Sequence, residues 1–86
     1  MYDIVVHRNV AKNVKNIPKL HLRKLSLLLE VLKTNQLPYI EFDLKKIRGT
    51  DATYRVWIGA YRVVYFVEEK AKTVHILKFE HREKVY

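Results

Sequence analysis

Apolar residues in the first third of the chain follow first an extended pattern and then a helical one. Residues 4–6 (IVV) predict a short strand. Val10, Val14 and Ile17 recur at steps of four and three residues, which predicts a brief helix. Pro18 stands where a second helix would begin, because proline is well tolerated in a first helical turn. The apolar face of that second helix consists of Leu22, Leu25, Leu29 and Leu32, widened by Leu28 and Val31.

The last third of the chain has the pattern of β-strands. Residues 54–58 (YRVWI), 61–67 (YRVVYFV) and 73–79 (TVHILKF) are rich in β-branched and aromatic residues. Gly59 and Ala60 separate the first two of these strands. They suit a type II′ hairpin turn, in which glycine takes the first of the two central positions.

The segment between the helices and these strands, residues 36–53, reads as an irregular connection. One helical turn is expected within it, around Leu44 to Ile47. The predicted order is therefore β-α-α-β-β-β in a single domain, residues 1–86. Two consecutive helices followed by consecutive strands favour the α+β class. We expect a mostly antiparallel four-stranded sheet with the two helices packed on one face.

Two arginines interrupt the apolar strands of the predicted hairpin. A two-residue turn places Trp57 opposite Arg62, and Arg55 opposite Val64. Side chains alternate between the two faces of a strand. The face toward the helices would carry Tyr54, Val56, Ile58, Tyr61, Val63 and Tyr65. The other face would carry Arg55, Trp57, Arg62, Val64 and Phe66. The two arginines would then be diagonal neighbours on the uncovered face, with Arg62 stacked on Trp57 as a structural alternative to a functional role.

Positive charge is abundant and unevenly distributed. The 86 residues include 17 Lys and Arg against 9 Asp and Glu, a formal net charge of +8. No acidic residue lies between Ile4 and Leu29. A second basic cluster consists of Lys45, Lys46, Arg48, Arg55 and Arg62. We interpret this segregation as a surface for a polyanionic partner, either nucleic acid, an acidic protein or an anionic membrane surface, rather than as a solubility charge.

Composition excludes several classes of site. The chain has no cysteine, which rules out disulfides and thiolate metal sites. Its four histidines lack metal-ligand spacing, and its two glycines form no phosphate-binding loop, so we expect neither a metal nor a cofactor. Residues 20–32 are too few and too polar to cross a bilayer. Because residues 1–9 also lack the layout of a secretory signal, we expect a soluble cytoplasmic domain.

One reaction needs neither a metal nor a cofactor. In RNA, the 2′-hydroxyl can attack its own phosphate and expel the 5′-oxygen. Catalysis then requires positive charge for the pentacovalent phosphate, which Arg55 and Arg62 could supply. It also requires a proton relay, for which His81 and Tyr86 are the candidates.

Several short motifs follow one another in a characteristic order. They are Tyr54-Arg55, Gly59, Tyr61-Arg62-Val-Val-Tyr65, Glu68-Glu69, Val74–Phe79 and His81-Arg82-Glu-Lys-Val-Tyr86. In this order the chain resembles the RelE/ParE superfamily of toxins from toxin–antitoxin systems, and specifically its RelE-like members. The leucine helix and residues 44–49 (LKKIRG) resemble the family as well, so the match covers nearly the whole chain.

The resemblance implies a ribosome-dependent endoribonuclease that cuts messenger RNA in the ribosomal A site. It also implies neutralisation by a cognate antitoxin in a toxin–antitoxin hetero-oligomer, and the charge of this chain favours an acidic, amphipathic antitoxin segment. By position, Arg55, Arg62 and Arg82 would bind or stabilise the scissile phosphate. Tyr86 would orient or activate the 2′-hydroxyl. The residues that would hold the RNA backbone are Lys45, Lys46 and Arg48.

Two points keep an alternative open. Trp57 stands where many relatives carry a second basic residue, so stacking on a base would replace one phosphate contact. ParE-like members share the fold but inhibit DNA gyrase, and a fold alone does not determine function. A non-catalytic toxin that binds gyrase is therefore the alternative to a ribonuclease.

Overall fold

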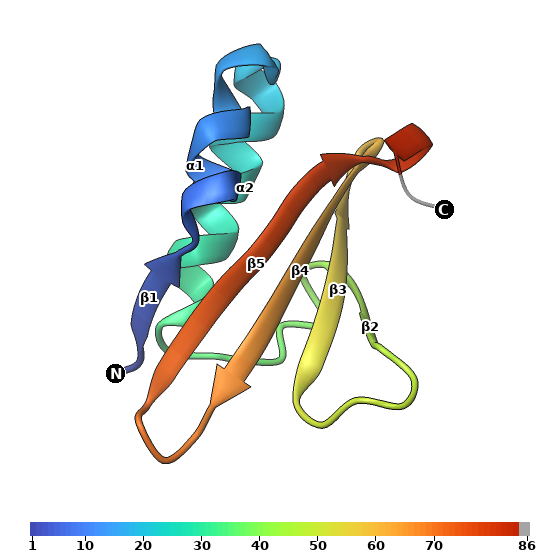
Figure 1. Ribbon diagram of the computed structural model, residues 1–86. Helices are drawn as coiled ribbons and strands as arrows, with labels where there is room; N and C mark the ends of the chain where they lie inside the picture. The colour runs from blue at the N-terminus through green and yellow to red at the C-terminus, as the bar shows by residue number, and fades with distance from the viewer. Residues whose placement is uncertain (85–86) are drawn as a thin grey trace.

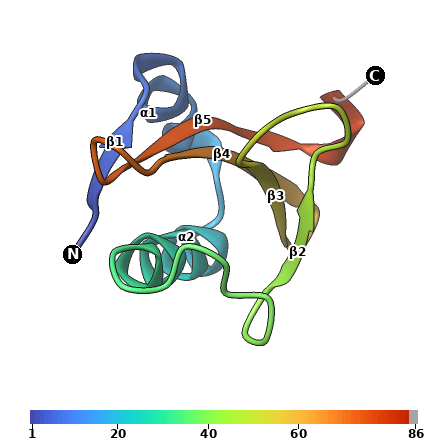
Figure 2. The same ribbon diagram turned by 90° about the horizontal axis from the view of Figure 1, so that it is seen from below.

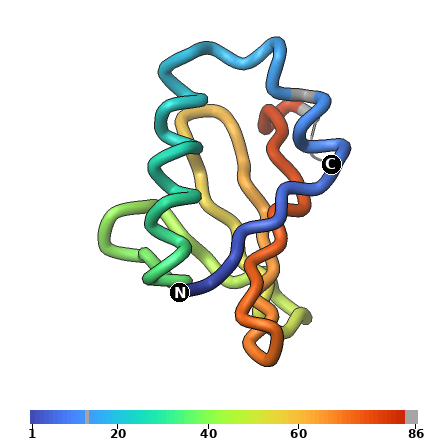
Figure 3. The backbone as a smooth tube through the Cα atoms, turned by 90° about the vertical axis from the view of Figure 1, so that its left-hand side faces the viewer, coloured from blue at the N-terminus to red at the C-terminus, as the bar shows by residue number. Residues whose placement is uncertain are grey.

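An open sheet of five strands, in the order β1-β5-β4-β3-β2, forms the centre of the computed structural model, which describes residues 1–84 (Figure 1). The strands are β1 (Asp3–Val6), β2 (Asp43–Lys46), β3 (Thr53–Ile58), β4 (Tyr61–Glu68) and β5 (Thr73–His81). Strand β1 runs parallel to β5, and the tube view in Figure 3 shows the two side by side. The other neighbouring strands are antiparallel, which confirms the α+β class.

Two α-helices connect β1 to the rest of the sheet. Helix α1 (Arg8–Asn13) follows β1 directly and packs against β5. A short 3-10 turn, η1 (Val14–Asn16), leads to Pro18, and helix α2 (Lys19–Leu32) begins directly after this proline, within one residue of the predicted start. Figure 2 shows α2 lying across one face of the sheet. No helix in residues 1–84 is long and apolar enough to cross a membrane.

One segment differs from the sequence-based expectation. The helical turn expected around Leu44 to Ile47 is wrong, because Asp43–Lys46 forms the edge strand β2, antiparallel to β3. The sheet therefore has five strands rather than four. A single helical turn is unstable by itself, whereas this segment gains ladder hydrogen bonds from β3 and packs Leu44 against the core. The exposed lysines of β2 suit an edge strand, which they protect from further pairing.

The predicted hairpin turn is confirmed. Ile58 lies opposite Tyr61 across a two-residue connection, with Gly59 at a φ of 59°. Of the two central turn residues, Gly59 has a positive φ and Ala60 does not, which identifies the type II′ turn. A Cβ at the position of Gly59 would lie 2.5 Å from Nε2 of His21, so a larger residue here would displace the His21 ring.

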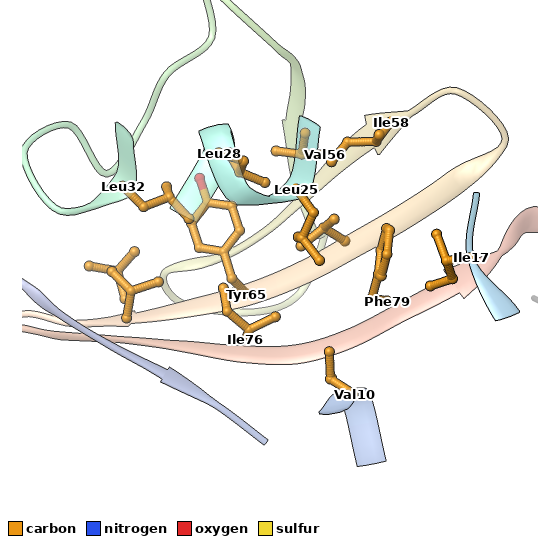
Figure 4. Packing of buried hydrophobic residues seen from close by; sticks show 13 residues of the cluster. Val10, Ile17, Leu25, Leu28, Leu32, Val56, Ile58, Tyr65, Ile76 and Phe79 are labelled. Atoms are coloured by element: carbon orange, nitrogen blue, oxygen red, sulfur yellow. The ribbon is translucent and has the colours of Figure 1, made fainter. Parts of the chain in front are cut away.

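The core forms between α2 and the face of the sheet that it covers (Figure 4). Helix α2 contributes Leu25, Leu28 and Leu32, and α1 and the segment after it contribute Val10 and Ile17. The sheet contributes Val56, Ile58, Val63, Tyr65, Val67, Val74, Ile76 and Phe79. Because Tyr54 and Tyr61 pack against this cluster, the predicted inward face of the hairpin is confirmed.

Tyr65 is the largest side chain that the core buries completely. Its hydroxyl donates a hydrogen bond of 2.8 Å to the backbone carbonyl of Gln36, which holds the segment after α2 against the sheet. Burial, with a smaller contribution from Tyr54, raises the pKa of Tyr65 well above its ordinary value.

The raised pKa of Tyr65 predicts a loss of stability at alkaline pH. A tyrosine in the unfolded chain ionises near pH ~10, whereas folded Tyr65 resists ionisation, so its contribution declines as pH rises above that value. Tyr65→Phe should cost about 1 kcal/mol at neutral pH, because the hydrogen bond to Gln36 is lost. Urea unfolding between pH 8 and 11 should show this difference shrinking as pH rises; a constant difference would contradict the assignment.

Candidate functional site

The face of the sheet opposite α2, which we call the open face, carries a row of positive charge. Lys45, Arg55, Val64 and Lys78 are successive cross-strand partners from β2 to β5. Three of these four residues are cations, and the fourth, Val64, is buried between them. We call these residues the cationic row. Its cations lie on a rigid sheet, with no acidic residue among the four positions. Such an arrangement suits the phosphates of an extended nucleic-acid strand.

A second row lies beside the first and has a different character. From β2 to β5 its members are Asp43, Trp57, Arg62 and Glu80. Nη2 of Arg62 donates to Oε1 of Glu80 over 3.2 Å, and the two side chains are 20% and 27% exposed. Nε of Arg62 is buried without a hydrogen-bond partner in residues 1–84. Arg62 is thus fixed by one carboxylate and retains donors for a further acceptor.

Trp57 stacks with Arg55, not with Arg62. The guanidinium carbon of Arg55 lies 5.4 Å from the centre of the Trp57 ring. The prediction that Arg62 stacks on Trp57 is therefore wrong. Glu80 holds the Arg62 guanidinium, and Arg55, two residues from Trp57 on the same face, takes the place over the ring. A cation–π contact of this kind contributes about 0.5–2 kcal/mol and holds both groups on the open face.

Arg82 follows β5 at the start of a short 3-10 turn, η2 (Arg82–Lys84). Its side chain is exposed. Its backbone N–H donates a hydrogen bond of 2.8 Å to the carbonyl of Ala60, which ties this end of β5 to the β3–β4 turn. The backbone of Arg82 is thus placed by the sheet, and its side chain extends from the surface formed by the described residues.

The other predicted site residues lie apart from this group. His81 lies opposite Tyr61, whose ring packs against the core, and the two rings form an edge-to-face contact at 5.2 Å. Nδ1 of His81 also accepts a hydrogen bond from the N–H of Glu83. Lys46 lies opposite Tyr54, on the side of the sheet that α2 covers, and Arg48 follows β2 in a turn. Tyr86 lies outside the described residues.

Two residues of the open face were missed in the sequence, Lys78 and Glu80. Both alternate with buried Phe79 along β5, which is the signal that could have placed them. A register shift between Val64 and Tyr65 hides that signal, because strict alternation from the start of β5 assigns them to the wrong face. Among the described residues, no group of three His, Asp or Glu side chains is placed to hold a metal ion.

Known proteins resemble this chain along its whole length. A Methanocaldococcus jannaschii protein named as the toxin RelE1 is 39% identical over 85 residues, covering 99% of this chain and 94% of the relative. No protein-family model matches the sequence.

Solved structures share the fold as well. The RelE–RelB complex from Pyrococcus horikoshii contains a chain with 34% identity and a TM-score of 0.86, covering 98% of each chain. The RelB–RelE complex from Methanococcus jannaschii has the same fold at a TM-score of 0.82, with 23% identity and coverage of 95% of this chain and 94% of that one. Because a relative of 39% identity spans nearly the whole sequence, the chain belongs to the RelE family of toxins from toxin–antitoxin systems.

Proposed function

We propose that this toxin is an endoribonuclease that cleaves messenger RNA in the A site of the ribosome and thereby stops translation in the cytoplasm. The observation that carries the proposal is the open face. Its cationic row lies next to Arg62 and Trp57, and Arg55 of that row stacks on the Trp57 ring. Guanidinium groups bind phosphate in bidentate fashion, and an indole ring offers a stacking surface for a base.

The same residues suit in-line attack by the 2′-hydroxyl. Arg55 and Lys78 would hold the backbone, while Arg62 and Arg82 would stabilise the charge of the pentacovalent phosphate. Arginine serves this purpose well, because it stays protonated at every physiological pH. Arg62 is already oriented by its contact with Glu80, so little reorganisation is needed when RNA binds.

A cognate antitoxin would complete the system. Solved relatives of this chain include RelE chains in complex with RelB. The net charge of +8 favours an acidic antitoxin segment that is disordered when free and wraps the toxin when bound. Lys46, which lies on the side of the sheet opposite the open face, and Arg48, in the exposed turn after β2, suit contacts with this segment or with ribosomal RNA backbone.

A toeprint assay with purified ribosomes tests the proposal. The purified toxin should truncate a defined message at the A-site codon, and the free message without ribosomes should remain intact. Addition of the antitoxin should abolish the truncation. An intact message together with inhibited DNA supercoiling by gyrase would instead assign the chain to the ParE-like mode of action.

The proposed chemistry also predicts that cleavage needs no added metal ion. A 2′-hydroxyl attack supported by arginines requires no Lewis acid, so chelation should leave the single-turnover rate within about twofold. The measurement compares EDTA-treated toxin with untreated toxin on programmed ribosomes at matched free magnesium, which keeps the ribosome intact. A strict requirement for manganese or zinc would exclude the metal-free mechanism.

A further inference from the structure

Glu80 is an acidic residue within a basic surface. It lies on β5 directly opposite Arg62, and its Oε1 accepts the hydrogen bond from Nη2 of that arginine. Its other oxygen, Oε2, has no hydrogen-bond partner in residues 1–84, and 27% of the side chain is exposed. The carboxylate is thus held by one oxygen and offers the second to a ligand.

Three other candidates for proton transfer, His81, Glu68 and Asp43, are less well placed. His81 lies on the opposite side of the sheet, against Tyr61. Glu68 is bound to Nε2 of His75 over 2.9 Å, at the other end of β4. Asp43 is exposed on the edge strand, two strands away from Arg62.

Glu80 also has the correct position relative to the cationic row. Lys78 precedes it by two residues on the same face of β5. Two residues along a strand span about 6.6 Å, which is close enough for one nucleotide to contact both side chains. A phosphate bound by Lys78 and Arg62 would bring the preceding ribose toward the free oxygen of Glu80.

We propose that Glu80 is the general base of RNA cleavage by this toxin, an inference that rests on the proposed ribonuclease function. The carboxylate takes the proton of the 2′-hydroxyl while the 2′-oxygen forms a bond to phosphorus. The bond between phosphorus and the 5′-oxygen breaks, and the leaving oxygen takes a proton from water. The hydroxide that remains then takes the proton from Glu80, which restores the carboxylate. The products are a 2′,3′-cyclic phosphate and a 5′-hydroxyl, so atoms and charge balance without an oxidant or a cofactor.

Arg62 has two functions in this arrangement. One N–H orients the base through Oε1 of Glu80, and the terminal N–H groups that do not contact Glu80 are available to the phosphate, whereas Nε is buried. The base and the phosphate are therefore held by the same guanidinium.

A purely structural ion pair predicts different behaviour. If Glu80 only restrains Arg62, its loss should change RNA binding and the rate together, because a displaced Arg62 affects both. If Glu80 only reduces the positive potential, its loss should tighten binding and leave the rate unchanged. A general base affects the chemical step alone.

The experiment compares Glu80→Gln with wild type on programmed ribosomes. The glutamine amide keeps an oxygen that can accept from Arg62 but cannot take the proton. Single-turnover cleavage should fall by roughly 10²- to 10⁴-fold, which is the usual contribution of a positioned base. Binding to ribosomes whose message carries a 2′-O-methyl group at the scissile position should stay within about threefold of wild type. Glu80→Asp should recover part of the rate, because it restores a carboxylate on a shorter side chain.

Glu69→Gln is the matched control. It removes the same charge from the exposed turn between β4 and β5, at the opposite end of β5 from Glu80. It should cleave like wild type. If Glu80→Gln also cleaves like wild type, or loses rate and binding in parallel, Glu80 is not the base, although the ribonuclease function stands. If wild type itself leaves the message intact under these conditions, the proposed function fails first.

Discussion

Replacement of Arg82 by alanine is expected to slow messenger RNA cleavage by about a hundred- to a thousandfold without unfolding the protein. The loss corresponds to about 3–4 kcal/mol of transition-state stabilisation, by analogy with the removal of one donor from an oxyanion site. The side chain of Arg82 is exposed, and its backbone bond to Ala60 persists in an alanine variant. The free energy of unfolding should therefore change by no more than about 0.5 kcal/mol.

Single-turnover cleavage on programmed ribosomes and circular dichroism melts of the same samples measure the two quantities. Arg23→Ala, which removes another exposed arginine, from α2, controls for the loss of one positive charge. Trp57→Ala should behave differently, because it removes the ring that stacks with Arg55 and should weaken binding or folding more than the chemical step. An Arg82→Ala variant that melts normally and cuts normally would remove Arg82 from the catalytic group.

Truncation of Leu28 to alanine should have the largest effect on stability. Leu28 is 0% exposed and packs where α2 meets the sheet. Removal of a fully buried leucine side chain typically costs about 2–5 kcal/mol, because apolar contacts are lost and the cavity closes only in part. The total free energy of unfolding of such a domain is about 5–15 kcal/mol, so this loss would be a large fraction of it.

Leu27 provides a matched control one residue earlier on the same helix, where 58% of the residue is exposed. Leu27→Ala should change the free energy of unfolding by less than about 0.5 kcal/mol. Urea denaturation followed by circular dichroism compares the two variants. Equal losses at both positions would mean that α2 does not present this face to the sheet.

The β3–β4 hairpin could be predicted because its determinants are local. Gly59 supplies the positive φ that a two-residue type II′ turn requires, and the turn length sets the register of the two strands. Once the register is set, alternation places Arg55 and Arg62 on the open face. The leucine spacing of α2 decides in the same way which side of the helix is buried.

Residues 43–46 could not be assigned in this way. A run of four residues is too short for its own pattern to separate a helical turn from a strand. The free edge of β3 decides the outcome, because it offers hydrogen bonds that only an extended segment can satisfy. The strand in turn places Lys45 beside Arg55, which completes one end of the cationic row.

The sequence by itself therefore determined the fold class, the hairpin register and the face on which two arginines gather. Only the tertiary structure decided the partners of those arginines. Glu80 is eighteen residues from Arg62, and the register shift after Val64 sets which β5 residues lie on the open face. Such a shift depends on how two long strands pack against one core, and therefore no pattern within either strand specifies it.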